Sequence, residues 1–446
     1  MVSPAPRSPA DSPVRELLAE LYRVATEAVD PAPALASRLA RLPREPARRW
    51  ILALGKAAEP MALTAVRTLA SWGLEPAGGL VVAPAAHSAP HPEIRVVAGD
   101  HPEPGPGSLA AAEALGEVAR RVGEQDEVWV LLSGGASSLL AAPVSGLAPA
   151  ELTALYRLLL GSGLDITAMN RIRKRFSRWG GGRLAAALAP ARVRVFVVSD
   201  VIGDDLASIG SGPCVPDPAT AAQVHRALDD AGLWSRIPAA ARQLVLAAAS
   251  GETAETPKPG DQAFARVTLE LIASNRLALE AAARRAAELG LATEVAETPL
   301  AGEAWATGAS VAAVLLQHCG PPGIPQPAAA TRCFIWGGET TVTLGDDPPG
   351  LGGRCQELAL AAAKTLDGAR PGVALMAAGT DGRDGPTDAA GAIVDGATWR
   401  TAAGAGRDPA RDLAAHDAYR ALDAAGALLK VGLTGTNVMD VVIGVV

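Results

Sequence analysis

Short apolar runs and longer amphipathic stretches alternate along the chain from about residue 14. The apolar runs contain few polar residues and end in loops that contain glycine. Five of them predict strands, over residues 49–54, 79–83, 94–98, 128–132 and 193–198. Strands that are apolar on both faces are typical of a parallel sheet with helices on both sides. The pattern therefore predicts an α/β fold with a doubly wound, mostly parallel sheet.

Stretches rich in Ala, Leu and Arg separate these runs and predict helices, for example over residues 108–122 and 150–160. Residues 251–262 and 319–331 are rich in turn-forming residues. Such segments predict connections between regular elements.

The region after the second connection has its own strand and helix pattern. Residues 333–336 and 341–344 flank a glycine turn, 356–366 has a helical pattern, and 373–378 predicts another strand. We therefore expect three parts: a frayed tail over 1–13, a Rossmann-like domain over 14–330 and a smaller α/β domain over 331–446.

Composition narrows the possible functions. The 446 residues are 49% apolar and 20% charged, which excludes a mostly disordered polyelectrolyte. A formal net charge of -7 gives no long-range attraction for nucleic acid. The uncharged stretch 128–150 is interrupted by glycine and proline, which makes it a poor membrane span. Four cysteines without a CxxC pair fit reduced thiols. We expect a cytoplasmic protein with small-molecule substrates and no nucleic-acid or membrane partner, and we leave a homodimer open.

Two loops that follow predicted strands carry candidate phosphate-binding groups, because ligands of doubly wound sheets bind beyond the carboxyl ends of strands. Lys56 follows the first run in the sequence Gly-Lys-Ala-Ala, where helix amides and a cation suit an anion, although a Walker loop is not matched. The second loop predicts a phosphate nest made of two glycines and three hydroxyls: Gly134, Gly135, Ser133, Ser137 and Ser138. A solvated lysine and an ordinary serine-capped turn are the alternatives.

Acidic residues follow two other predicted strands. Asp200 comes at the end of the strand 193–198, a common place for a metal-binding or catalytic carboxylate. Asp381 and Asp384 lie in an acid-rich loop after the strand 373–378. Such spacing suits Mg²⁺ or the orientation of a hydroxyl, but it departs from the EF-hand pattern and so argues against calcium.

The C-terminal region adds a polar glycine loop and a second cation. Gly338, Glu339, Thr340 and Thr341 offer a carboxylate and hydroxyls to a sugar-like or phosphate ligand, with a simple hairpin turn as the alternative. Arg354 follows two glycines at the start of a predicted helix. An arginine there could grip an oxyanion bidentately, and a surface arginine is the alternative.

A basic run and one cysteine carry further predictions. Arg171, Arg173, Lys174, Arg175 and Arg178 predict a solvated helix face, with the steering of an anionic substrate as the alternative. Cys355 directly follows Arg354. The dipole of a helix N-terminus lowers the pKa of a partly exposed thiol, so we expect alkylating reagents to reach Cys355.

Ten sequence blocks, in order from about residue 50 to about residue 440, carry a resemblance to a known family. They are LALGKAA, GDHPEPGPGS, LLSGGASS, MNRIRKRFSRWGGGRLA, VSDVIGDD, GSGPCVPDP, WGGETTVTL, GGRCQELALA, GTDGRDGPTDAAGA and TGTNVMD. Together they resemble the glycerate 2-kinase family, whose C-terminal domain is named MOFRL. The resemblance implies two α/β domains around a cleft, and phosphorylation of D-glycerate to 2-phosphoglycerate by ATP with Mg²⁺. It also implies that Lys56 and Arg354 are the family's essential lysine and arginine.

Phosphoryl transfer mainly requires the positioning and neutralisation of negative charge. Lys56 and Arg354 would neutralise the substrate carboxylate or the transferring phosphoryl group. Asp200, with Asp381 or Asp384, would hold Mg²⁺ or take the hydroxyl proton. The loops 133–138 and 337–341 would cradle phosphates or glycerate. Departures from residues common among relatives occur at three positions: Arg175, Cys214 and Cys355.

Two other functions stay open. An NAD(P)H-dependent hydroxypyruvate reductase, a name that relatives have carried, would need a GxGxxG turn after an early strand, and neither glycine loop of the N-terminal region provides it. A non-catalytic sugar-acid-binding protein would need neither two cations nor several loop acids.

Overall fold

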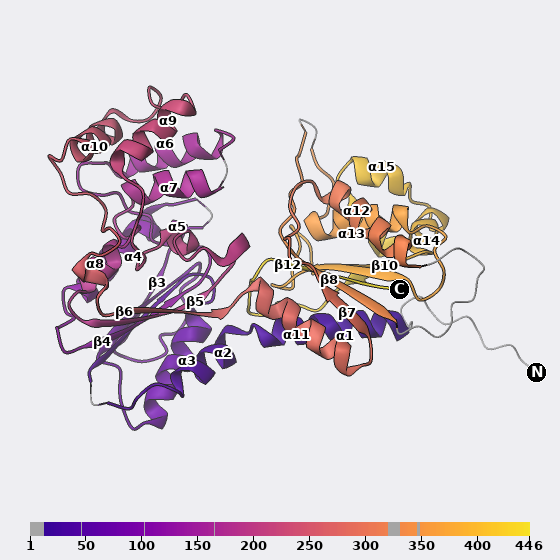
Figure 1. Ribbon diagram of the computed structural model, residues 1–446, viewed down its shortest axis with the longest axis horizontal. Helices are drawn as coiled ribbons and strands as arrows, with labels where there is room; N and C mark the ends of the chain where they lie inside the picture. Colours follow the sequence, from indigo (N-terminus) through magenta and orange to yellow (C-terminus); the bar gives the residue numbers. More distant parts are fainter. Residues whose placement is uncertain (1–12, 46, 102, 165, 320–330, 346–347) are drawn as a thin grey trace, which may run out of the picture. The chain divides into compact units, whose positions relative to one another are not determined.

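The structure, a computed structural model, describes residues 13–446 except 46, 102, 165, 320–330 and 346–347 (Figure 1). The chain divides into two compact units. We call Pro31–Ile272 the parallel unit. The mixed unit comprises the residues before it, up to Asp30, together with Ala273–Val446.

The parallel unit contains a six-stranded sheet in the order β3-β2-β1-β4-β5-β6. Its strands are β1 (Arg49–Leu54), β2 (Gly78–Ala83), β3 (Ile94–Ala98), β4 (Glu127–Leu132), β5 (Arg192–Val198) and β6 (Val267–Ala273). β1 pairs in parallel with β2 and β4, and these pair in parallel with β3 and β5. The five predicted strands thus lie within one residue of their predicted ends, and the doubly wound parallel sheet is confirmed.

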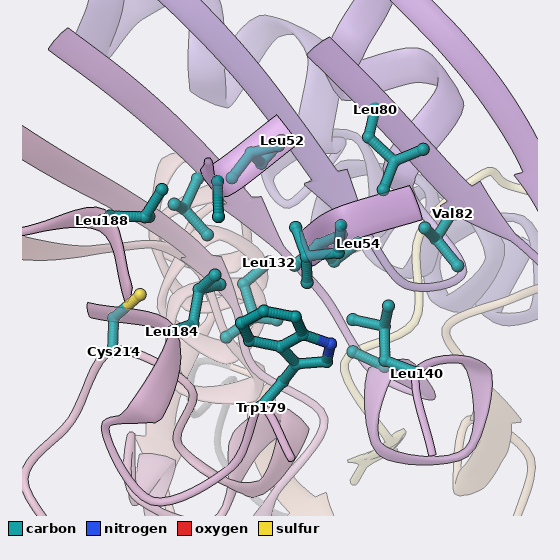
Figure 2. Packing of buried hydrophobic residues seen from close by; sticks show 14 of the residues in the cluster. Leu52, Leu54, Leu80, Val82, Leu132, Leu140, Trp179, Leu184, Leu188 and Cys214 are labelled. Atoms are coloured by element: carbon teal, nitrogen blue, oxygen red, sulfur yellow. The ribbon is translucent and has the colours of Figure 1, made fainter. Parts of the chain in front are cut away.

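Helices cover both faces of this sheet. α3 (Ala58–Ser71) packs on β1 and β2. Side chains of the opposite face pack against three helices: α4 (Pro106–Ala119), α5 (Ala136–Leu139) and α8 (Arg183–Leu188). The indole of Trp179 lies among Leu132, Leu140 and Leu184 in this core (Figure 2). Every residue of β1, β2 and β4 is buried, which explains why these strands are apolar except for Arg49 and Glu127, which form an ion pair with each other.

A separate helical layer has its own apolar core, on the side of the sheet that carries α4, α5 and α8 (Figure 1). Its helices are α6 (Pro149–Leu160), α7 (Ile166–Phe176), α9 (Ala221–Asp230) and α10 (Ala239–Ala249). The basic run lies on and after α7, and the prediction of a solvated face is wrong for Lys174 and Arg175, because both are buried. Arg175 forms an ion pair with Glu255. Glu255 also pairs with Lys258, so Arg175 is part of an ion-pair network.

The remaining elements of the parallel unit are short or lie at its edge. They are α2 (Pro31–Leu39) and the 3-10 turns η2 (Ile202–Asp204), η3 (Ile209–Ser211) and η4 (Gln262–Phe264). α2 packs on α3.

The mixed unit contains a second six-stranded sheet in the order β11-β10-β9-β12-β8-β7. Its strands are β7 (Ala292–Val295), β8 (Arg332–Gly338), β9 (Ala374–Gly379), β10 (Gly391–Asp395), β11 (Leu428–Leu429) and β12 (Asp440–Val445). β7 and β8 are parallel, and the other pairs are antiparallel. The predicted strand 341–344 is wrong, because β12 pairs with β8 instead.

Helices cover both faces of the mixed sheet as well (Figure 1). One face packs against α12 (Ala304–His318), α13 (Arg354–Thr365), α14 (Thr398–Gly404), α15 (Pro409–Ala414) and α16 (Ala418–Ala424). The other face carries α1 (Pro13–Ala28) and α11 (Asn275–Glu288). α1 is fastened by the Tyr22 hydroxyl, which donates to Gly379 O at 2.7 Å, and by Thr436 Oγ1, which donates to Val29 O at 2.8 Å.

The compact units differ from the predicted domains in two respects. The parallel unit ends at Ile272 rather than near residue 330, because α11, β7 and α12 pack with the C-terminal sheet. Helix α1 also belongs to the mixed unit, although it precedes the parallel unit in sequence. The predicted tail, up to residue 12, and residues 320–330 of the predicted connection lie outside the described residues. None of the described helices combines the length and apolar character needed to cross a bilayer.

Candidate functional site

The strand order of the parallel unit reverses between β1 and β4, so the loops after these two strands lie at a topological switch point. In this order, the connections from β1 and β4 leave in opposite directions, which opens the sheet at the carboxyl ends of these two strands. Backbone bonds join the loops: Lys56 N donates to Gly134 O at 2.9 Å, and Ser133 N donates to Leu54 O at 2.9 Å. Lys56 and the serine–glycine loop therefore lie side by side, as their positions after adjacent strands predict.

Gly55 allows this close approach. Its φ is +123°, and an added Cβ would lie 2.4 Å from Ser133 O. Ser133 itself is buried, and its Oγ accepts a hydrogen bond from Ala57 N at 3.0 Å. The hydroxyl thus fixes the loop before α3, which corrects its predicted role as a ligand contact.

The other residues of the serine–glycine loop differ from Ser133 in burial and in contacts. Ser137 and Ser138 are half-buried, and Ser137 Oγ lies 2.8 Å from Ser211 Oγ. Gly135 has a φ of +83°, and an added Cβ would lie 3.3 Å from Lys56 Cγ. The glycine thus permits the lysine stem to lie against the loop.

Asp200 lies against the same loop. An added Cβ on Gly134 would lie 1.8 Å from Asp200 Oδ2. Burial raises the pKa of Asp200, and the charge of Lys56 partly opposes this rise. The structure therefore brings Lys56, Asp200 and the two glycines together, and their binding of a substrate stays a prediction.

His101 is a fifth member of this group that the sequence reasoning missed. Its ring lies 3.2 Å from the position of a Cβ on Gly135. Burial lowers the pKa of His101, and the charge of Lys56 lowers it further. The available signal was the block GDHPEPGPGS, which follows β3, yet no catalytic pattern included its histidine.

The predicted groups of the mixed unit line a pocket of about 560 Å³. We call it the C-terminal pocket. Its lining includes Glu339, Thr340, Thr341, Gly353, Arg354, Glu357, Asp384 and His416. Gly338 directly precedes this lining, and its φ of +142° lets the chain pass Leu300, whose carbonyl oxygen would lie 2.2 Å from an added Cβ. The loop then runs beside residues 300–304 through backbone bonds of Glu339 and Thr341, so it is not a hairpin turn.

Arg354 is held by two carboxylates in this pocket. Its Nε and Nη2 donate to Asp440 Oδ2 and Oδ1 at 2.6 and 2.9 Å, and Nη1 lies 2.8 Å from Glu339 Oε1. Asp440 is 5% exposed. Sequence reasoning missed this residue, although it ends the block TGTNVMD. Arg354 is consequently neither a surface arginine nor a cation with an uncompensated charge.

Asp384 holds the start of α13. Its Oδ1 accepts from Cys355 N at 3.1 Å and its Oδ2 accepts from Gln356 N at 2.8 Å. Burial raises the pKa of Asp384 to about 7, although the two amide bonds lower it. Each oxygen thus accepts an amide of α13 and the carboxylate caps this helix, whereas its role as a metal ligand stays a prediction.

The predicted magnesium ligands do not form a cluster within either unit. Asp200 belongs to the parallel unit, whereas Asp381 and Asp384 belong to the mixed unit. Asp381 Oδ1 accepts from Arg383 N at 3.0 Å. Across the described ranges, no group of three or more His, Cys, Asp or Glu side chains could hold a metal ion.

The prediction of a reactive Cys355 is wrong. The thiol is 1% exposed, and burial, followed by the charges of Asp440 and Asp384, raises its pKa well above the ordinary value. The dipole argument requires partial exposure, and packing of α13 against the sheet removes it.

Comparisons with known proteins identify the family of this chain. Residues 17–246 match the family described as "Domain of unknown function (DUF4147)", and residues 332–440 match the MOFRL family. A D-glycerate 2-kinase from Thermotoga maritima is 37% identical over 97% of this chain and 98% of its own. The chain belongs to the glycerate 2-kinase family.

A solved structure of the family supports the fold. A crystal structure of a glycerate kinase from Thermotoga maritima matches with a TM-score of 0.84 at 36% identity, covering 97% of this chain and 99% of the other. A relative from Agrobacterium vitis, provisionally named a hydroxypyruvate reductase, is 36% identical over 97% of this chain and 94% of its own. The resemblance carried by the ten blocks is confirmed, and so is the α/β fold.

Proposed function

We propose that the protein transfers the terminal phosphoryl group of ATP to D-glycerate, giving 2-phosphoglycerate and ADP. The observation that carries the proposal is that Lys56 and Asp200 lie close together beyond the carboxyl ends of β1 and β5, the two strands that flank β4. This arrangement occurs in a chain that matches a D-glycerate 2-kinase over nearly its whole length.

Each group beside these strand ends has a definite task in this reaction. The exposed Lys56 ammonium neutralises the carboxylate of glycerate or an oxygen of the transferring phosphoryl group. Asp200 accepts the proton of the attacking hydroxyl, and its raised pKa suits a general base that works near neutral pH. The glycines at 134 and 135 keep the backbone close to the substrate.

Arg354 supplies the second cation of the proposal. Its guanidinium has five N–H groups, and one on each of Nη1 and Nη2 remains beyond those directed at Asp440 and Glu339. These remaining groups are the ones that would bind an oxyanion. Because two carboxylates balance the guanidinium charge, we expect Arg354 to orient the oxyanion through directed hydrogen bonds rather than to attract it by net charge.

Mg²⁺ belongs to the proposal only as the ion that accompanies ATP. Such an ion is bound largely by phosphate oxygens and water and needs few protein carboxylates. The described acids do not supply a complete site, so no step is assigned to a protein-held metal.

A coupled assay tests the function directly. Purified protein with ATP, Mg²⁺ and D-glycerate should release ADP, and phosphorus NMR should show 2-phosphoglycerate as the product. Oxidation of NADH with hydroxypyruvate, without ADP formation from glycerate, would establish the reductase instead. Binding of glycerate without either reaction would establish a sugar-acid-binding protein. The loop Gly55-Lys56-Ala57 lacks the glycine spacing that NAD(P)H requires, which favours the kinase.

The four cysteines are free and buried, which supports a reducing compartment such as the cytoplasm.

A further inference from the structure

The C-terminal pocket contains two buried oxygens that lack a hydrogen-bond partner. They are Thr340 Oγ1 and Glu357 Oε1, and neither has a partner among the described residues. The residues are 4% and 3% exposed, and both line the pocket. A buried polar atom without a partner destabilises a protein by about 1–3 kcal/mol. A ligand with matching polar atoms would remove this cost.

A histidine fixes the orientation of the Glu357 carboxylate. His416 Nδ1 lies 2.8 Å from Glu357 Oε2, which leaves Oε1 as the oxygen without a partner. His416 also has a φ of +54°, a conformation that few residues other than glycine adopt. This backbone conformation brings its ring to the pocket wall beside Glu357.

The rest of the wall suits a flat, uncharged group. Val342, Leu344, Pro349 and Pro386 give apolar surfaces. The acidic side chains of the lining outnumber its single arginine, and that arginine is already paired with Asp440 and Glu339. The acidic lining therefore favours a ring with amino donors, and the two remaining N–H groups of Arg354 are the part of the wall that would bind an oxyanion. The volume of about 560 Å³ lies within the range of about 300–1,000 Å³ that is usual for pockets that bind small molecules.

We propose that the C-terminal pocket binds the adenosine part of ATP. The exocyclic amino group of adenine donates to Glu357 Oε1, and the Thr340 hydroxyl bonds a second polar atom of the nucleoside. The proposal rests on the proposed kinase function for the identity of the nucleotide. D-glycerate is a poorer match for the pocket, because it is much smaller than about 560 Å³ and has no amino donor for Glu357 Oε1.

The test measures nucleoside binding without catalysis. The full-length protein is titrated calorimetrically with adenosine and with inosine, which has an oxygen where adenosine has the amino group. Adenosine should bind at least about tenfold more tightly, because a carboxylate accepts from an amino group and repels a carbonyl oxygen. Equal affinities would overturn the proposal.

Two variants locate the contacts. Thr340→Val should weaken adenosine binding about 3- to 10-fold, the usual loss for one neutral hydrogen bond. Glu357→Gln should reduce the preference for adenosine over inosine, because an amide both donates and accepts. Thr365→Val is the control, since Thr365 also lies on α13 but does not line the pocket. The thermal midpoint of each variant shows whether it is folded, and if Glu357→Gln unfolds, Thr340→Val and the inosine comparison decide.

Steady-state kinetics separates this proposal from the kinase proposal. The KM for ATP should rise in Thr340→Val while the KM for D-glycerate stays unchanged. A rise in the glycerate KM alone would assign the pocket to the acid and overturn the proposal. If the wild-type protein forms no ADP from glycerate, the kinase assignment fails, and the adenosine titrations still decide what the pocket binds.

Discussion

Each unit places a glycine, a cation and a carboxylate around the start of a helix, but the two units use these groups differently. In the parallel unit the Lys56 side chain is exposed, and no described residue forms an ion pair with it. In the mixed unit Arg354 is paired with Asp440 and Glu339. The same combination of residue types thus leaves a cation available for chemistry in one unit and anchors two acids in the other.

The carboxylates show the same contrast. Asp200 packs against Gly134 and accepts no side-chain hydrogen bond from another described residue, whereas both oxygens of Asp384 accept amides of α13. A carboxylate with free oxygens can accept a proton from a substrate. A carboxylate that caps a helix contributes to stability instead. Proximity of residue types in a motif therefore does not separate catalytic from structural roles, but the occupancy of their hydrogen-bonding atoms does.

The largest expected effect comes from removing the available cation. Lys56→Ala should lower turnover about 100- to 1000-fold, the usual loss when one preorganised group that stabilises a developing charge is removed. Its thermal midpoint should stay close to wild type, because an exposed charge contributes little to stability. Coupled ADP release and calorimetry measure the two effects. Arg67→Ala is the control, since Arg67 is exposed on the helix that follows Lys56.

If Lys56→Ala turned over at the wild-type rate, Lys56 would have no part in the reaction, and the contrast between the cations of the two units would not hold.

Removal of the anchoring cation, Arg354, should lower the stability of the protein. Arg354→Ala leaves the buried Asp440 without its bidentate partner, and we expect the free energy of unfolding to fall by about 2–3 kcal/mol. This figure is reduced from that of a fully buried pair, because the Arg354 side chain is 34% exposed. Urea unfolding measures the change. Arg276→Ala, which breaks an exposed pair with Glu280, should lose less than about 1 kcal/mol. A wild-type unfolding free energy for Arg354→Ala would show that Arg354 does not stabilise the acids.

The sequence predicted much of the fold, because strands buried on both faces leave a strong local signal. The five apolar runs of the parallel unit became strands within one residue of their predicted ends. The run 341–344 alternates threonine with apolar residues but forms no strand, because β8 pairs with β12, which lies about a hundred residues further along. Nothing in a local pattern records that pairing. The packing of α1 with the C-terminal sheet was missed for the same reason.

The candidate site was predicted in position more fully than in role. Lys56, Gly134 and Asp200 lie together because they follow neighbouring strands, and sheet topology can be inferred from sequence. The roles of Ser133 and Cys355 were misjudged, because each depends on burial and on partners distant in sequence. The chemistry of a hydroxyl or a thiol can be inferred from the residue type, but whether the group is accessible to a ligand cannot.

The stability of the protein should depend on pH through the capping carboxylate, Asp384. The ordinary pKa of an aspartate is about 3.9, and burial raises that of Asp384 to about 7. Between these values the folded state holds a proton that the unfolded state has released, so stability falls as the pH rises. The asparagine of Asp384→Asn cannot titrate. Between pH 5 and 7 the free energy of unfolding of this variant should therefore fall by about 1–2 kcal/mol less than that of the wild type. Urea unfolding at both pH values measures this, and parallel curves would contradict it.

The smallest expected effect comes from replacing a glycine beside each carboxylate, Asp200 or Asp384, with alanine. Gly134→Ala adds a methyl group at the position of Asp200 Oδ2, and we expect kcat to fall about tenfold, or about 1.4 kcal/mol, while the thermal midpoint changes little. Gly404→Ala is the control, since no atom lies within 4 Å of its added Cβ. Gly353→Ala places its methyl group 2.3 Å from Asp384 Oδ1, so it should disturb the cap of α13 and lower the thermal midpoint. An unchanged kcat in Gly134→Ala would mean that the position of Asp200 does not matter to the reaction. A loss of stability equal to that of Gly353→Ala would mean that both acids are structural.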